Sequence, residues 1–358
     1  SGVIINDYGH ASNDFRVESD NNTHMLFVDA GNDKVGVGTS SPGQTLEVAG
    51  TLGYPLLVRP SYVLGGRAME IVQNDKELIG FVKSALEVAE GRRVLIDKYF
   101  EGREVEVDAI CDGETVVIPG IMEHVERAGV HSGDSMAIYP SLTLTDAEKE
   151  TIIDYTTRIG LELGIRGLMN VQYVLLGGSA YRSPESIGWR KAVNNVAGDK
   201  SQVYVIEVNP RSSRTVPFIS KMTGVPMVRL AVNAMLGNSL KSEGYDGGLW
   251  PEQGAFGVKV PVFSMSKLAG VDTYLGPEMK STGEVMGVDL DYRSAVLKSL
   301  MAAGLTFPTN GSVLLSVSDR SKMDAIPMVK TLARAGCQIC THDIGPYTYN
   351  GCPNNIWS

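Results

Sequence analysis

The sequence is poor in cysteine, lacks long hydrophobic runs and carries no excess of positive charge. Four cysteines in 358 residues are too few for a disulfide framework, so we expect a reducing compartment, the cytoplasm. No apolar run reaches the roughly 18 residues that a membrane span needs, and the N-terminus has no signal-peptide pattern. Because 41 acidic residues outnumber 32 basic ones, a nucleic-acid-binding surface is disfavoured. The sequence therefore predicts a soluble globular protein with neither membrane nor nucleic acid as a partner.

Length and composition bear on the domain organisation. A chain of 358 residues predicts two or three domains, at roughly 100–200 residues each. The chain begins with Ser1 rather than Met, so we expect either a fragment or a processed product. Residues 1–50 differ in composition from the rest, which places a first boundary near residue 50.

Residues 1–50 are rich in Asn, Asp, Gly and Ser. Short β-type runs alternate with turn residues and show no helical period; they start at Asp14, Met25, Lys34 and Thr45. The stretch 35–48, which begins Val-Gly-Val-Gly-Thr-Ser-Ser-Pro-Gly, resembles sequence found repeatedly in phage tail-fibre and related trimeric fibre proteins. This resemblance implies a fibre-like β segment.

From Gly53 onward the pattern becomes mixed α/β. Residues 104–110 alternate charged and apolar side chains, which is typical of a half-exposed strand. Thr145 and Glu148 form a capping box at the start of a helix. Apolar runs predict further strands at 56–59, 94–97, 115–119, 167–175, 203–209 and 313–317, and helices at 76–89, 145–163, 230–236 and 326–335. Segment 177–200 is polar without an apolar face, and the periodicity ends at Thr341.

Cysteine and histidine motifs offer metal or redox chemistry only weakly. Cys337 and Cys340 form a CxxC motif, but they lie in a predicted strand, where residues three apart point to opposite faces. No second CxxC completes a metal site, so we prefer partly buried strand cysteines. His124 and His131 are compatible with a metal pair, although hydrogen-bonded structural histidines are commoner.

Two predicted strands bring oxygen-bearing side chains together. Asn170 and Gln172 share a face of strand 167–175, and Glu207 and Asn209 share a face of strand 203–209. If these strands pair antiparallel, a carboxylate and two or three amides meet, and Mg²⁺ prefers such oxygen ligands. A polar sheet face without a metal is the alternative interpretation.

Arginines flank this cluster. Arg211 and Arg214 follow Asn209 closely, and their planar guanidiniums suit phosphate or carboxylate recognition. Solvated loop arginines are the alternative. Arg59 precedes a Gly-Gly turn at 65–66, where the backbone could approach an anion closely.

Taken in order, five segments resemble the C-terminal half of the carbamoyl phosphate synthase large subunit. The segments are Tyr54–Val72, Gly120–Ser135, Gly167–Gln172, Val205–Arg211 and Gly276–Gly287. The Arg-Pro-Ser-Tyr and Glu-His-Val-Glu-Arg-Ala-Gly-Val-His sequences are similar to the second ATP-grasp copy of that family, which phosphorylates carbamate. The resemblance runs from about residue 53 to about residue 340, apart from segment 177–200.

The resemblance implies site residues by position. The divalent-metal ligands are then Gln172, Glu207 and Asn209, and Arg211 and Arg214 lie beside the transferred phosphoryl group. Nucleotide contacts are implied at Arg59 for a phosphate, Glu104 for the ribose, Lys98 and Phe100 at the hinge near adenine, and a lining loop of Gly129, Val130, His131 and Ser132.

The same resemblance implies an enzyme of the ligase class and its partners. Carbamate attacks the γ-phosphoryl group of ATP, giving carbamoyl phosphate for pyrimidine and arginine biosynthesis. The implied cofactors are ATP with Mg²⁺ or Mn²⁺, and K⁺, and the implied partner is the glutaminase small subunit. A phage-fibre mosaic with a non-catalytic ATP-grasp-derived passenger is the alternative, and a nucleotide-binding module without catalysis is another.

The expected fold is an α/β (α+β) ATP-grasp domain that is truncated at its N-terminal side. We predict a fibre-like segment at 1–50, the ATP-grasp domain at 51–305 with an insertion at 176–200, and the start of a methylglyoxal-synthase-like α/β domain at 306–345. Residues 346–358 form an irregular tail.

Overall fold

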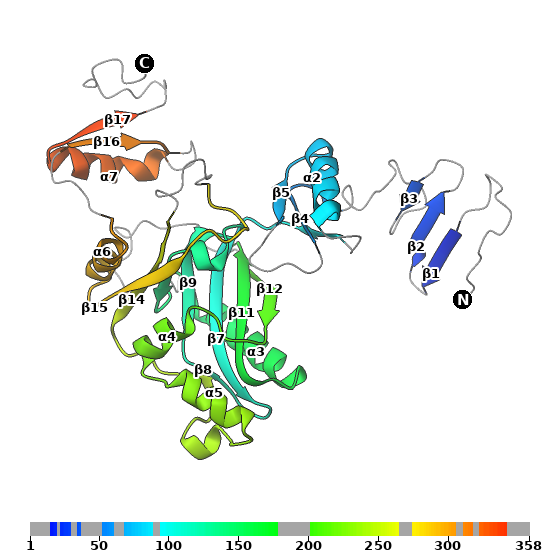
Figure 1. The fold of residues 1–358 in the computed structure, drawn as a ribbon, viewed down its shortest axis with the longest axis horizontal. Coiled ribbons are helices and arrows are strands. Elements are labelled where there is room, and N and C mark those ends of the chain that lie inside the picture. Colours follow the sequence, from blue (N-terminus) through cyan, green and yellow to red (C-terminus); the bar gives the residue numbers. More distant parts are fainter. Residues whose placement is uncertain are drawn as a thin grey trace.

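The computed structural model describes most of the chain in a series of segments (Figure 1). These segments are 15–19, 22–29, 34–36, 52–60, 68–88, 94–177, 201–264, 274–305, 311–317 and 322–341. No helix within these segments is long and apolar enough to cross a membrane.

Three short strands near the N-terminus form an antiparallel sheet in the order β1-β2-β3. They are β1 (Phe15–Ser19), β2 (Asn22–Asp29) and β3 (Lys34–Gly36). The predicted β-type runs at Asp14, Met25 and Lys34 are therefore confirmed. The run at Thr45 lies outside the described residues.

A second sheet of three strands carries one helix. Its strands are β4 (Leu56–Pro60), β5 (Glu70–Val72) and β6 (Val94–Lys98), in the order β5-β4-β6, and its helix is α2 (Asp75–Val88). Leu56, Val58 and Val72 are buried and pack against Leu78 and Val82 of α2. Because the apolar residues fall on one face of each element, the sheet and helix close over a small core, as the periodicity predicted. We call this unit the small lobe.

The main body is a nine-stranded sheet (Figure 1). Its main path runs β12-β11-β7-β9-β10-β14-β15, and β8 and β13 extend it beside β7. The strands are β7 (Arg103–Asp112), β8 (Val116–Ile118), β9 (Ile121–Arg127), β10 (Ala137–Tyr139), β11 (Arg166–Leu176), β12 (Gln202–Asn209), β13 (Gly248–Leu249), β14 (Phe256–Val262) and β15 (Gly283–Asp289). The predicted strands 104–110 and 115–119 both form, and they pair antiparallel as β7 and β8.

Helices cover the two faces of this sheet unequally. Helix α3 (Asp146–Glu162) begins with the predicted capping box of Thr145 and Glu148 and packs on the face that carries Val107 and Val171. Helices α4 (Val216–Thr223) and α5 (Met227–Met235) pack on the opposite face, over Ile110 and its neighbours. They cover only one end of that face, so the polar residues of β7 and β11 lie beyond them.

Strand β7 corrects one prediction. Its alternation of charged and apolar residues predicted a half-exposed strand, but both faces are buried. The charged residues Glu104, Glu106 and Asp108 are at most 3% exposed. The reason is that β7 is a central strand, with β11 on one side and β9 on the other. Polar partners, among them His124, Asn170 and Thr215, cover its charged face.

The C-terminal part contains one helix on the main sheet and a separate parallel unit. Helix α6 (Tyr292–Ala302) packs on β14 and β15. Strands β16 (Gly311–Leu315) and β17 (Cys337–Thr341) pair in parallel, with helix α7 (Lys322–Arg334) between them in the chain. Cys337 is buried and Cys340 is half-buried in β17, which confirms the preferred interpretation of the CxxC motif.

Candidate active site

Strands β11 and β12 bring the predicted oxygen cluster together. They pair antiparallel, with Gln172 opposite Glu207 and Asn170 opposite Asn209. Directly opposed residues of an antiparallel pair project to the same face of the sheet. The pairing that the sequence left conditional is thus confirmed, and its register places a carboxylate beside amides.

The side chains of this cluster fit a hard divalent cation. The Asn209 Nδ2 atom donates to Glu207 Oε1 at 2.7 Å, and Gln172 Nε2 donates to Ser132 Oγ at 3.0 Å. Since both amide nitrogens are engaged, the amide oxygens and the carboxylate are the groups left to face a cation, which are the ligand types Mg²⁺ takes. In the described segments no group of three or more His, Cys, Asp or Glu side chains could hold a metal.

A β-bulge in β12 places an aromatic residue on the same face. The register shifts between Gln172 and Tyr173, which leaves Ile206 without a partner and sets Tyr204 opposite Val174. The ring of Tyr204 stacks on Phe100, with centroids 4.8 Å apart. Strict alternation from Glu207 would have put Val205 there instead, so the sequence did not indicate Tyr204.

The charged row of β7 surrounds a buried histidine. His124 Nε2 lies 3.2 Å from Glu106 Oε2, and His124 Nδ1 lies 3.4 Å from Glu104 Oε1, an ion-pair distance rather than a hydrogen bond. Burial alone would lower the pKa of His124, but the nearby charge of Glu104 and the hydrogen bond and charge of Glu106 outweigh it and raise the pKa to about 9. His124 is therefore a buried cation between two acids.

The neighbouring carboxyl groups of Glu106 and Asp108 have pKa values shifted in opposite directions. Burial would raise the pKa of Glu106, but the hydrogen bond to His124 and its charge hold it below the ordinary value. Burial and then the neighbouring Glu106 charge raise the pKa of Asp108. Environments that push two acids apart in this way are common at functional sites.

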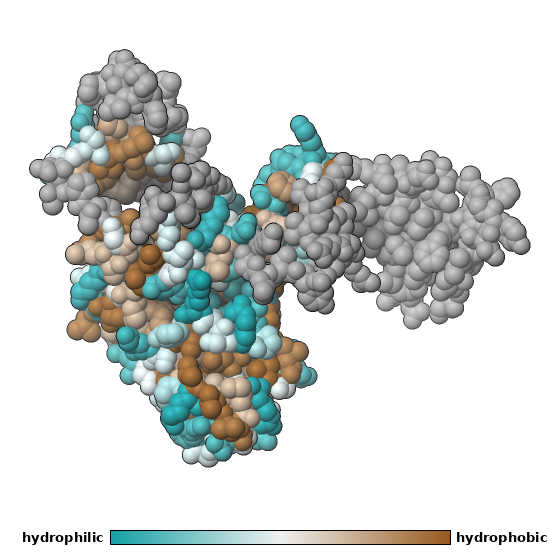
Figure 2. All heavy atoms as spheres, in the orientation of Figure 1, coloured by the Kyte–Doolittle hydropathy of each residue, from teal (hydrophilic) through white to brown (hydrophobic). Residues whose placement is uncertain are grey.

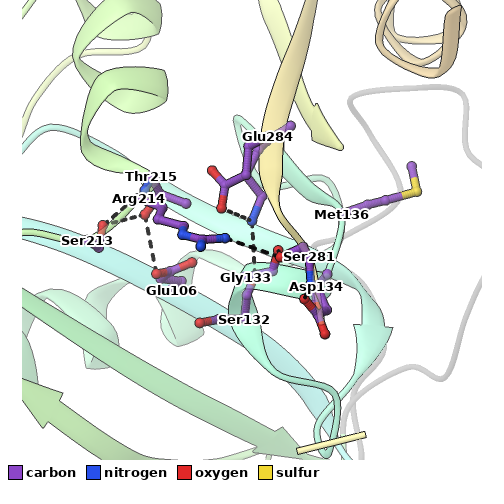
Figure 3. A network of polar contacts seen from close by, with 12 residues as sticks. Glu106, Ser132, Gly133, Asp134, Met136, Ser213, Arg214, Thr215, Ser281 and Glu284 are labelled. Carbon is purple, nitrogen blue, oxygen red and sulfur yellow. Dashed lines mark hydrogen bonds and ion pairs between the residues drawn. The ribbon is translucent and has the colours of Figure 1, made fainter. Parts of the chain in front are cut away.

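The two arginines behave differently. Arg214 follows strand β12, and its Nη1 atom donates to Ser281 Oγ at 3.2 Å (Figure 3). Ser281 comes just before strand β15. Arg211 is exposed, and its Nη1 donates to the neighbouring Ser212 carbonyl at 3.0 Å. Arg214 therefore contacts a distant part of the chain, whereas the hydrogen bond of Arg211 joins it to its neighbour in the same loop.

Residues 129–132 form a tight loop against the cluster. Gly129 has a φ of +110°, and a Cβ there would lie 2.7 Å from Tyr99 Oη and 3.0 Å from Ile71 of the small lobe. His131 Nδ1 accepts from the Gly133 amide at 3.0 Å, and burial lowers the pKa of His131. Val130 is half-buried between these residues. The loop thus lies between the small lobe and the main sheet.

Ser132 links this loop to a second buried cation. It begins the short 3-10 helix η1 (Ser132–Asp134), and its carbonyl accepts from Lys259 Nζ at 3.0 Å. Lys259 is only 1% exposed and lies 3.7 Å from Glu284 Oε1 (Figure 3 shows this region). Ser132 therefore contacts both Gln172 and Lys259.

Two of the expected nucleotide residues are engaged within the small lobe. Arg59 Nε donates to Asp97 Oδ2 at 2.8 Å across the β4–β6 pair. Lys98 Nζ donates to the carbonyls of Gly53 and Tyr54 at 2.9 and 3.0 Å. Both cations are half-buried, and they belong to a different sheet from the Gln172–Glu207 pair. Their expected nucleotide contacts therefore stay predictions.

The amino-acid sequence matches a known protein family over more than half of its length. Residues 27–182 and 190–243 match the family described as "Carbamoyl-phosphate synthase L chain, ATP binding domain". The chain belongs to this family. The match begins within residues 1–50 and gives no support to the fibre resemblance of that segment. It also enters the expected insertion 176–200 from both sides, and residues 183–189 alone separate the two matched parts.

Curated relatives of this ATP binding domain are carbamoyl phosphate synthase large chains. The relative from Caldanaerobacter subterraneus subsp. tengcongensis is 52% identical over 302 residues, and that from Thermomicrobium roseum is 50% identical over 301 residues. Each alignment covers 84% of this chain and 26% of the relative. The chain thus spans about a quarter of the length of the relatives it matches.

A solved structure confirms the fold of the ATP binding domain. The biotin carboxylase–β,γ-ATP complex from Campylobacter jejuni is similar, with a TM-score of 0.51 and 16% identity. The similarity covers 70% of this chain and 57% of the other. The expected ATP-grasp α/β fold is therefore confirmed, with its mixed sheets and covering helices.

Several polar residues around the site were missed by sequence reasoning. Glu106, Asp108, Lys259 and Ser281 are buried and polar, and all contact residues of the site. The signal for the first two was present, because Glu104, Glu106 and Asp108 alternate along one strand. Alternation alone does not distinguish a solvated face from a buried polar face, and the second requires partners from other strands.

Proposed function

We propose that this chain carries the carbamate-phosphorylating centre of a carbamoyl phosphate synthase large subunit. The supporting observation is the pair Gln172–Glu207, opposed across β11 and β12 and followed by Asn209. In the proposed reaction an oxygen of carbamate attacks the γ-phosphorus of ATP, the bond to the β,γ-bridging oxygen breaks, and carbamoyl phosphate and ADP form. The amino-acid identity to large-chain relatives supports the same assignment.

The chemistry requires positioning and charge neutralisation rather than a strong base. Carbamate is already an anion, so no side chain has to remove a proton before the attack. Gln172, Glu207 and Asn209 would hold Mg²⁺ or Mn²⁺, which when bound neutralises phosphate charge and polarises the reacting phosphoryl group. Arg214, whose guanidinium donates to Ser281, would neutralise charge on the transferred group.

The remaining roles follow the same proposal. Glu104 binds the ribose, Phe100 and Lys98 lie by the adenine, Arg59 contacts a phosphate, and the loop of Gly129, Val130, His131 and Ser132 lines the nucleotide. Arg211 assists Arg214. K⁺ is proposed as a further cofactor, the glutaminase small subunit as the partner that supplies ammonia, and the cytoplasm as the location.

Calorimetry tests the metal and nucleotide site. We expect Mg-ATP to bind the chain and Glu207→Ala to weaken binding at least about tenfold, since a charged metal ligand is lost. Glu162→Ala, which removes an exposed acid at the end of α3, is the matched control and should bind as the parent does. Equal heats for the parent and Glu207→Ala would remove the proposed metal site.

Product formation tests the reaction itself. The chain is incubated with Mg-ATP, bicarbonate and ammonium, which supply carbamate in solution, and carbamoyl phosphate is trapped. Binding of Mg-ATP without any carbamoyl phosphate would identify a nucleotide-binding module and not a catalyst.

A further inference from the structure

Asp108 bridges two parts of the site with its two carboxylate oxygens. It lies in the central strand β7 and is 1% exposed. Its Oδ1 accepts from Asn170 Nδ2 of strand β11 at 3.0 Å. Its Oδ2 accepts from Ser213 Oγ at 2.8 Å and from Thr215 Oγ1 at 2.5 Å. One oxygen therefore bonds the strand of the proposed ligand Gln172, and the other bonds the turn that follows β12.

The bonds of Thr215 show that this turn is built around Asp108. Thr215 is the N-cap residue of α4, a position where a threonine hydroxyl usually accepts from the first backbone amides of its helix. It makes no such cap here. Instead it donates its proton to Asp108, while Ser213 Oγ accepts from the Thr215 amide at 3.1 Å. The hydroxyl of Thr215 therefore serves a contact with the sheet and not a cap of its own helix.

Arg214 lies between these two anchored residues. Figure 3 shows Ser213, Arg214 and Thr215 side by side, with the guanidinium extended toward Ser281. Ser281 is itself held, since its amide donates to Asp134 Oδ1 at 2.8 Å and its hydroxyl donates to the Gly133 carbonyl at 2.8 Å. The base of the Arg214 side chain is thus placed by Asp108 and its tip by Ser281.

We propose that Asp108 is a positioning residue for phosphoryl transfer, which holds the Ser213–Thr215 turn and thereby Arg214 in register with the strands of the metal ligands. This inference rests on the proposed function, because it takes Arg214 to face the terminal phosphate. Asp108 does not touch the nucleotide and acts only through the turn. A carboxylate is required because all three neighbours donate to it.

The test compares two nucleotides that differ only beyond the β-phosphate. Calorimetry gives the affinities of the full chain for Mg-ADP and for the Mg complex of the β,γ-imido analogue of ATP. The affinity for the analogue divided by the affinity for Mg-ADP isolates contacts to the terminal phosphate, whereas damage to the fold weakens both ligands alike. We expect Arg214→Ala to lower this ratio about tenfold, as for loss of a charge-assisted hydrogen bond. Asp108→Ala and Thr215→Val should each lower it several-fold.

Three further variants separate positioning from general stability. Thr215→Ser keeps the hydroxyl and should restore most of the ratio that Thr215→Val loses. The double variant of Asp108→Ala and Arg214→Ala should lose no more than Arg214→Ala alone, because both act through one guanidinium. Asp112→Ala removes another carboxylate of β7, which accepts from the amides of Glu114 and Leu240 far along the strand. It should lower stability and leave the ratio unchanged.

The outcomes distinguish this inference from the proposed function. A parent chain that binds neither nucleotide overturns both. If the parent binds both nucleotides and Arg214→Ala lowers the ratio, but Asp108→Ala and Thr215→Val keep it, Asp108 is a structural carboxylate and the inference alone fails. If Asp108→Ala does not fold, as judged by circular dichroism, Thr215→Val and Ser213→Ala decide the question in the same way.

Discussion

His124 is the residue whose chemistry depends most on its surroundings. A histidine in water is mostly neutral at pH 7, but His124 is buried between Glu104 and Glu106 and has its pKa raised to about 9. The expectation of a hydrogen-bonded structural histidine thus fits better than a metal pair with His131. The Nδ1 atom of His131 accepts from the Gly133 amide in its own turn, and burial lowers the pKa of His131.

The raised pKa of His124 predicts a pH dependence of stability. The unfolded histidine loses its proton near pH 6.5, whereas the folded one keeps it to about pH 9. The stabilisation that protonated His124 contributes is therefore complete below pH 6.5 and is lost as the pH rises through about 9. The free energy of unfolding should fall in this window by about 1 kcal/mol per pH unit, and His124→Gln should flatten the fall. Urea titrations at several pH values measure it, and equal slopes for the two proteins would contradict the assignment.

At the scale of elements, identical substitutions in two helices should have opposite effects. Gly80 lies in α2, and a Cβ added there would meet nothing within 4 Å. Gly160 lies near the end of α3, and a Cβ added there would lie 2.9 Å from Val116 Cγ2 and 3.0 Å from Cys111 Sγ. The close packing of α3 on β7 and β8 therefore requires glycine at 160, although glycine is a poor helix former.

Gly80→Ala should stabilise the chain by about 0.5–1 kcal/mol, through the lower conformational entropy of the unfolded state. Gly160→Ala gains the same term but should be destabilising overall, because overpacking a tight core costs about 1–3 kcal/mol. Urea denaturation of the two variants beside the parent measures both values. A stabilised Gly160→Ala protein would show that α3 can move away from the sheet at small cost.

At the scale of the whole molecule, hydrophobic residues gather on the outer side of α5. Figure 2 shows brown residues over the lobe that Figure 1 labels α5. Val228, Val232, Met235 and Leu236 are between 43% and 76% exposed. A contiguous apolar patch on a surface promotes association, whereas single exposed apolar residues do not.

Replacing part of this patch should reduce self-association. We expect the variant with Val228→Ser and Leu236→Ser to sediment with less concentration dependence and to bind less hydrophobic dye than the parent. Lys241→Ser, which changes an exposed polar residue nearby, is the control and should behave as the parent does. Unchanged sedimentation and dye binding in the double variant would mean that this patch does not drive association.

Features that depend on neighbours within a few residues could be predicted from the amino-acid sequence. Periodicity located α2, α3, β11 and β12, and the capping box placed the start of α3. Two-residue spacing predicted that Gln172 shares a strand face with Asn170, and Glu207 with Asn209. The five motifs, taken in their order along the chain, predicted the family that the match to the ATP binding domain confirms.

Which polar residues are buried, and which partners they have, follows from the tertiary structure alone. Glu106 and Asp108 were expected to face solvent and instead bond Asn170, Thr215 and His124, because strands and loops distant in sequence close over β7. Likewise the bulge at Ile206 turns Tyr204 to the site face. Burial and register arise from packing between elements, and local sequence spacing carries no record of that packing.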